Sequence, residues 1–236
     1  MTQPLNLVDV LDDAALMSLE HQIHLSEVLG EHQWFVDLEE ERFSFTGART
    51  FICTGVHLLG SAAPGPRSWL WSWANPAGYS PRIVGVAESV REFGRTNGLS
   101  ELSSPEVPFD MVPAGNGDPA SVARVMVEVA KVVTGRWTSY TGDAGHGTHA
   151  AFLVEHPDFL LPAPEPARIL RVLHQALAEV PLTDHRRAVH SYSVRRGLPS
   201  TFSSDFSQLV LTGQRFTVTV SFDPQGRVAH IGAGQT

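Results

Sequence analysis

The stretch FICTGVHLL, residues 51–59, decides the fold of the N-terminal part of this chain. In an extended strand Phe51 and Leu59 fall on one face, while Val56 and Leu58 fall on the other. A strand that is apolar on both faces is usually central in its sheet and covered on both sides. The pattern therefore predicts a central strand at this position.

Turn residues separate this strand from its neighbours. The turn APGP at 63–66 leads into WLWSW at 69–73, and two short strands at 34–38 and 43–46 come first. Short connections join antiparallel neighbours, so we expect an antiparallel β-meander. Amphipathic helices flank these strands at 8–29, at 82–97 and after the helix cap Asp118. The predicted class is α+β, an antiparallel β-meander packed with helices.

A proline-rich segment divides the chain. Residues 160–166, LLPAPEP, carry three prolines at alternating positions, which stiffen the backbone and remove hydrogen-bond donors. Two helices follow, and then a hairpin whose first strand, residues 216–222, alternates apolar and polar without exception. We therefore expect two domains, a larger one at 1–161 and a small C-terminal α+β unit of two helices and a β-hairpin at 167–236.

Composition excludes several classes of protein. The 236 residues carry a net charge of −8 and a pI near 5.7, which argues against general nucleic-acid binding. The single cysteine, Cys53, excludes an internal disulfide framework. The sequence has no apolar run of about 18 residues and no secretion-signal pattern at its start, so we expect a cytoplasmic protein without a membrane partner. Lys131 is the one lysine among 17 basic residues, a bias typical of high-GC bacterial genomes.

Four short motifs resemble an uncharacterised bacterial family of unknown function with a WLWSWAN-type tryptophan motif. They are WFVDL at 34–38, LLGS at 58–61, WLWSWAN at 69–75 and REFG at 91–94. The resemblance spans roughly residues 10–155 and leaves the C-terminal unit outside. It implies a shared fold and no assigned activity.

The tryptophans Trp69, Trp71 and Trp73 are candidate binding residues. Residues two apart share a strand face, so the three indoles would form a ladder able to stack a sugar, a nucleobase or a partner's side chain. The alternative is a core position, which Leu70 and Ala74 favour because they make the strand apolar on both sides.

Candidate metal ligands gather in a glycine-rich turn. Asp143, His146 and His149 are spaced three apart, a plausible start to a zinc or iron site. The alternative is a solvated polar turn. His21 and His24 form a second pair on the first helix, for which the sequence supplies no third ligand.

No catalytic group stands out. Cys53 and His57 lie about 13 Å apart along a strand, too far for a thiolate–imidazole pair, so a buried structural cysteine is favoured. The sequence contains no G-x-S-x-G, H-E-x-x-H or P-loop motif. We assign no catalytic residue and no cofactor.

The helix expected at 184–196 is basic, although the chain as a whole carries a net negative charge. Arg186, Arg187 and His190 are candidate residues for binding a phosphate or an acidic protein partner, while Val189 and Tyr192 take the inward side. The alternative is a solvated face whose cations offset the helix dipole.

These observations favour a non-catalytic cytoplasmic binding or protein-interaction module over an enzyme. The alternative is a metal- or histidine-dependent hydrolase using Asp143, His146 and His149.

Overall fold

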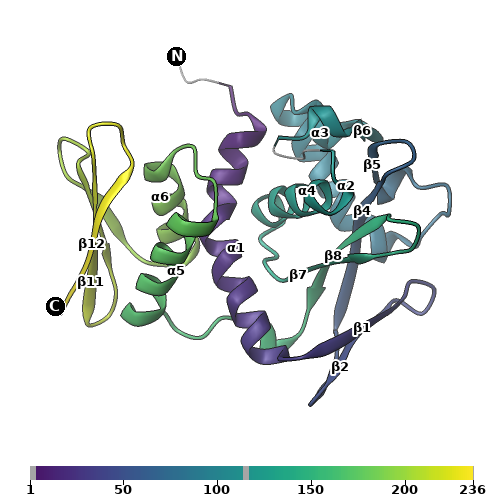
Figure 1. Cartoon of the computed structure of the whole chain (residues 1–236), viewed down its shortest axis with the longest axis horizontal. Helices are drawn as coiled ribbons and strands as arrows, with labels where there is room; N and C mark the ends of the chain where they lie inside the picture. The colour runs from purple at the N-terminus through teal and green to yellow at the C-terminus, as the bar shows by residue number, and fades with distance from the viewer. Residues whose placement is uncertain (1–3, 114–116, 236) are drawn as a thin grey trace. The chain divides into compact units, whose positions relative to one another are not determined.

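The computed structural model describes residues 4–113 and 117–235 (Figure 1). These residues form six α-helices and three antiparallel sheets. The predicted α+β class is therefore confirmed.

The described chain separates into two compact units. The first contains His21–Leu160 together with the residues before Val8, and the second contains Val8–Glu20 with Leu161–Thr236. Helix α1 (Leu7–Leu29) thus contributes its first half to the second unit. The predicted division into domains at 1–161 and 167–236 stays a prediction. It assigned Val8–Glu20 to the first domain, whereas these residues belong to the second compact unit.

The first unit holds two sheets. A three-stranded sheet has the order β1-β2-β3, and a five-stranded sheet has the order β6-β5-β4-β8-β7. The strands are β1 (His32–Asp37), β2 (Arg42–Gly47), β3 (Thr50–Ile52), β4 (Gly55–Ala63), β5 (Ser68–Trp71), β6 (Glu106–Pro108), β7 (Ser139–Asp143) and β8 (His149–Glu155). The central strand β4 pairs with both β5 and β8.

The predicted central strand at 51–59 is divided between these two sheets, which corrects the sequence-based expectation. The Cys53 backbone N–H donates to Phe43 O of β2 at 2.9 Å, whereas the Thr54 N–H donates to Glu155 O of β8 at 2.7 Å. The hydrogen-bond partner thus changes from one residue to the next. Ile52, which a strand covered on both faces would bury, is consequently exposed.

Helices α2 (Pro81–Asn97) and α4 (Pro119–Thr134) pack against β4, and the short α3 (Ser100–Ser103) packs against α2. The side chains of Ser80 and Asp118 cap α2 and α4, each just before a proline, and the Asp118 cap is the one that the sequence predicts. Three 3₁₀ turns complete the unit: η1 (Ser72–Ala74), η2 (Phe109–Met111) and η3 (Pro157–Phe159).

The second unit packs helices α5 (Pro166–Glu179) and α6 (His185–Arg195) against a four-stranded sheet (Figure 1). The sheet order is β12-β11-β10-β9, with β9 (Ser200–Phe202), β10 (Gln208–Thr212), β11 (Phe216–Phe222) and β12 (Val228–Gln235). The alternating residues of β11 bury Phe216, Val218, Val220 and Phe222, as their spacing predicts.

Within the described residues, no helix combines the length and the apolar character that crossing a membrane requires.

Candidate functional site

The candidate tryptophans do not form a ladder. Trp69 and Trp71 lie on β5 with fully buried side chains, and their rings meet edge to face with centroids 5.4 Å apart. The Trp71 indole N–H donates to Glu101 O at 3.1 Å. Trp73 lies in the 3₁₀ turn η1, not on the strand, and the Arg91 guanidinium is 4.2 Å from its ring centroid. The structure thus places Trp69 and Trp71 in the core, the alternative that the sequence left open.

Close packing against the Trp69 ring explains why residue 60 is a glycine. A Cβ on Gly60 would overlap the Leu70 carbonyl and the Trp69 ring. Trp69, Trp71 and Gly60 are therefore packed in the core, where the two indoles offer no surface to a ligand.

The proposed metal ligands occupy the β7–β8 hairpin. Asp143 and His149 are paired across the two strands, and His146 lies in the turn with a positive φ of 53°. The Asp143 carboxylate accepts the Gly145 backbone N–H at 2.7 Å, as a turn-forming aspartate does. Across the described residues, no group of three or more His, Cys, Asp or Glu side chains is arranged to hold a metal ion.

Cys53 lacks the features of a nucleophile. Burial raises the pKa of its thiol to about 12, so the reactive thiolate is scarce at neutral pH. His57 faces other groups: its Nε2 lies 3.5 Å from Glu155 Oε1, and its Nδ1 lies 3.2 Å from the Arg82 carbonyl.

The basic helix α6 finds acidic partners within its own unit. Arg187 forms a two-point ion pair with the Asp13 carboxylate of α1, at 2.9 and 2.7 Å, and lies 3.5 Å from Asp9. The hydrogen bonding of the Arg187 guanidinium to the accepting Asp13 carboxylate is the main reason that the pKa of Arg187 is raised. Of the candidate residues on this helix, Arg187 is therefore already neutralised by α1, and its charge is not available to an external acidic partner.

A second ion pair joins these helices in the interior. Arg196 donates from Nε and Nη2 to the Glu20 carboxylate at 2.9 and 3.2 Å, and the Tyr192 hydroxyl donates to the same carboxylate at 2.8 Å. The Glu20 side chain is fully buried and that of Arg196 is 8% exposed. Burial, and next the Glu20 charge, raise the pKa of Tyr192. Nη2 of Arg196 also donates to the Pro162 carbonyl at 2.6 Å.

Asp12 ties the loop before α6 to the same helix α1. Its carboxylate accepts the backbone N–H groups of Thr183 and Asp184 at 2.9 and 2.8 Å. Burial raises the pKa of Asp12, and these two hydrogen bonds partly offset that effect.

The remaining candidates on α6 stay accessible. His190 is exposed, and its ring lies 5.7 Å from that of Phe202. Arg186 is half-buried, and its Nε donates to the Phe206 carbonyl at 3.0 Å. Val189 and Tyr192 are buried, as the helical spacing predicts.

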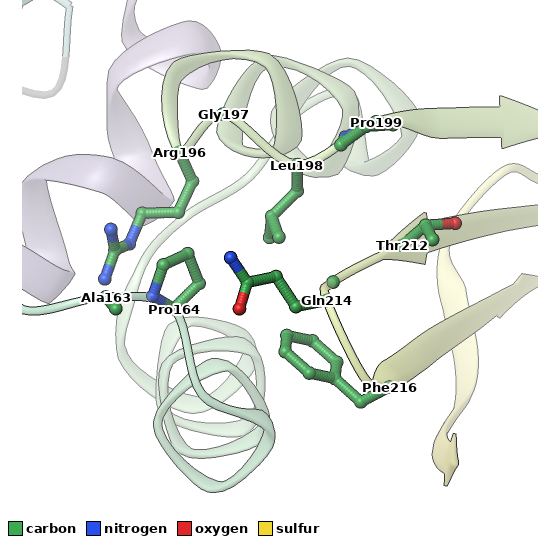
Figure 2. Close-up of a pocket in the computed structure, with 10 residues that line it drawn as sticks. Ala163, Pro164, Arg196, Gly197, Leu198, Pro199, Thr212, Gln214 and Phe216 are labelled. Atoms are coloured by element: carbon green, nitrogen blue, oxygen red, sulfur yellow. The ribbon is translucent and has the colours of Figure 1, made fainter. Parts of the chain in front are cut away.

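The clearest candidate site is a pocket of about 450 Å³ in the second unit (Figure 2). Three separate segments form it: the residues before α5, the turn from α6 to β9, and the turn between β10 and β11. Its lining residues are Ala163, Pro164, Arg196, Gly197, Leu198, Pro199, Thr212, Gly213, Gln214 and Phe216.

Three polar side chains, those of Arg196, Thr212 and Gln214, line this pocket among apolar residues. Gln214 extends into the space between Pro164, Leu198 and Phe216 (Figure 2). Its amide makes no hydrogen bond to another described residue, so one donor group and one acceptor are available to a ligand. Arg196 contributes little net charge, because Glu20 pairs with it.

A glycine permits this arrangement. The Gly213 N–H donates to Phe216 O at 2.8 Å, which closes the β10–β11 turn. A Cβ on Gly213 would overlap the Phe216 ring, so only glycine lets this ring form the pocket wall. Sequence reasoning missed the pocket because its segments lie far apart in the chain; the only local signals were glycine at 197 and 213.

The model of a family of unknown function, DUF6882, matches residues 8–157. This match confirms the predicted membership of a family of unknown function; the bacterial origin and the tryptophan motif stay predictions. No curated protein and no solved structure matches the chain.

Proposed function

This chain belongs to DUF6882, a family of unknown function, and we propose that it is a non-catalytic binding protein that takes a small ligand in the pocket of its second unit. The pocket residues lie beyond the matched segment 8–157, so the family itself suggests no ligand. The cytoplasmic location and the bacterial origin expected from the sequence are part of this proposal.

One observation carries the proposal: a pocket of about 450 Å³ whose walls are apolar and into which an unpaired amide projects. Small-molecule sites have volumes of roughly 300–1,000 Å³ and combine apolar walls with a few polar groups that fix orientation. The walls formed by Pro164, Leu198 and Phe216 suit a compact apolar ring.

The Gln214 amide indicates which polar group the ligand should carry. The Gln214 amide both donates and accepts, so it matches a carboxamide or a lactam, which does the same. A free carboxylate fits less well, because the Arg196 charge is balanced by Glu20. The proposed ligand class is therefore a small neutral ring compound that carries an amide-like group.

Two matched variants test this proposal. Gln214→Trp places an indole where the amide projects and fills the pocket, whereas Arg215→Trp adds the same indole at the next exposed residue, outside the lining. Amide NMR spectra of the labelled full chain are recorded with a set of aromatic carboxamides.

We expect some carboxamides to shift the signals of Gly197, Leu198 and Gly213, and Gln214→Trp to abolish these shifts while Arg215→Trp retains them. The proposal fails if no compound shifts these signals, or if both variants bind alike.

A further inference from the structure

Arg186 differs from the neighbouring cations of α6. Arg187 pairs with Asp13 and Arg196 with Glu20, but no carboxylate of the described residues lies within ion-pair distance of Arg186.

The Arg186 side chain is nevertheless held in place. Its Nε donates to the Phe206 carbonyl at 3.0 Å, and its guanidinium lies 5.4 Å from the centroid of the Phe222 ring. Together these contacts fix the guanidinium plane and leave its two terminal nitrogens without a partner among the described residues.

Arg186 lines a polar cavity of about 280 Å³. The start of α6 and the β11–β12 turn line it with Thr183, Asp184, His185, Arg186, Gln225, Gly226 and Arg227. Donor groups dominate this lining: two guanidinium groups, an imidazole, an amide and a hydroxyl.

The β11–β12 turn approaches Arg186 closely. Gly226 has a φ of +83°, and a Cβ there would lie 2.8 Å from Nη1 of Arg186. The turn is held by Asp223, whose carboxylate accepts the backbone N–H groups of Gln225 and Arg227, both at 2.9 Å. The cavity wall opposite Arg186 is therefore ordered as well.

Both acidic groups near the cavity are already engaged. The Asp184 carboxylate accepts the Arg187 backbone N–H at 3.0 Å as the cap of α6. The Asp223 carboxylate pairs with Arg227 at 2.8 Å. The positive charge of Arg186 is the one that neither of them balances.

We propose that this cavity binds a phosphate group, with the terminal nitrogens of Arg186 as its main donors. An oriented guanidinium presents two parallel N–H groups that match two phosphate oxygens, and such charge-assisted pairs are stronger than neutral hydrogen bonds. His185 and Gln225 supply further donors around the same space, whereas Arg227 is paired with Asp223. This site is separate from the Gln214 pocket and does not depend on it.

Inorganic phosphate and phenyl phosphate are the probes, each titrated into the labelled full chain at constant ionic strength and followed by amide NMR. We expect saturable shifts at Arg186, Gly226 and Arg227. Tighter binding of phenyl phosphate identifies a phosphate monoester as the ligand, and tighter binding of inorganic phosphate identifies the free ion.

Variants with equal charge changes supply the control. Arg186→Gln should weaken phosphate binding at least about tenfold, since a hydrogen bond to a charged group contributes about 1.5–3 kcal/mol. Arg215→Gln, which removes one charge elsewhere in the same unit, should leave binding unchanged. Arg186→Lys keeps the charge without the planar pair of donors and should bind with intermediate affinity.

The proposal is overturned if neither probe saturates below about 10 mM, or if Arg186→Gln and Arg215→Gln weaken binding equally, which would indicate general charge attraction. An unchanged thermal melt of Arg186→Lys confirms that any loss of affinity does not come from unfolding.

Discussion

Replacing Glu20 by alanine tests the interior ion pair that joins α1 to α6. The Glu20 carboxylate is fully buried and receives three hydrogen bonds, two from Arg196 and one from the Tyr192 hydroxyl. In Glu20→Ala the Arg196 guanidinium remains buried without its counter-ion. Because the Arg196 side chain is 8% exposed, water cannot easily replace the lost carboxylate.

The expected loss follows from this geometry. Removing one member of a buried ion pair costs about 3–5 kcal/mol, because the remaining charge stays desolvated. Replacing both members, as in Glu20→Leu with Arg196→Met, should cost less than the single change, since no buried charge is left. Glu179→Ala is the matched surface control: its carboxylate accepts only an exposed hydrogen bond from Gln175, and the loss should stay below about 0.5 kcal/mol.

The assay must report on the second unit. All five tryptophans lie within His21–Leu160, so tryptophan fluorescence follows the first unit. Urea unfolding followed by far-ultraviolet circular dichroism, combined with hydrogen exchange of the α6 amides, measures the second. We expect Glu20→Ala to accelerate α6 exchange strongly.

A loss of unfolding free energy under about 1 kcal/mol in Glu20→Ala, or a double variant as unstable as the single one, would contradict a buried ion pair of this strength. Either result would mean that Arg196 finds water or another partner.

Other predictions follow from single groups. Trp71→Ala should cost about 3–5 kcal/mol by urea unfolding, because a fully buried indole leaves a cavity; a loss under about 1 kcal/mol would contradict its core position. Alkylation of Cys53 at pH 8 should be at least tenfold slower in the folded chain than in urea, since burial raises its pKa to about 12; equal rates would contradict this. The Ser203 hydroxyl, followed by Ser207, lowers the pKa of Asp205 from 3.8 to about 2, so its contribution to stability is complete above about pH 4 and is lost as the pH falls towards 2. Carboxyl NMR should find this pKa raised in Ser203→Ala, and an unchanged value would contradict the assignment. Metal analysis should find no stoichiometric zinc or iron, and metal that disappears in His149→Ala would instead favour the hydrolase hypothesis.

Local patterns predicted those parts of the fold that local forces determine. The alternation of residues 216–222 predicted the buried face of β11, and Asp118 followed by a proline predicted the start of α4. Both depend on side chains a few residues apart. By contrast, β9 and β10 were not predicted. Strand β9 has only three residues, and the turn before β10 contains an apolar residue, the exposed Phe206.

Contacts between distant residues could not be predicted. Arg187 and Asp13 are 174 positions apart, so the sequence presented α6 as a free basic helix when α1 supplies its counter-charges. The Gln214 pocket likewise needs three segments to meet. Trp73 was misplaced for a local reason: the chain leaves the strand at Trp71 and forms a 3₁₀ turn, which rotates the third indole off the shared face.

Ligand capture tests directly whether the Gln214 pocket binds a small molecule. The full chain, Gln214→Trp and Arg215→Trp are each incubated with a small-molecule extract, washed, denatured, and the released compounds are identified by mass spectrometry. We expect the unaltered chain and Arg215→Trp to retain a small neutral ring compound that Gln214→Trp does not retain. Retention of the same compound by all three proteins, or of none by the unaltered chain, would contradict this expectation.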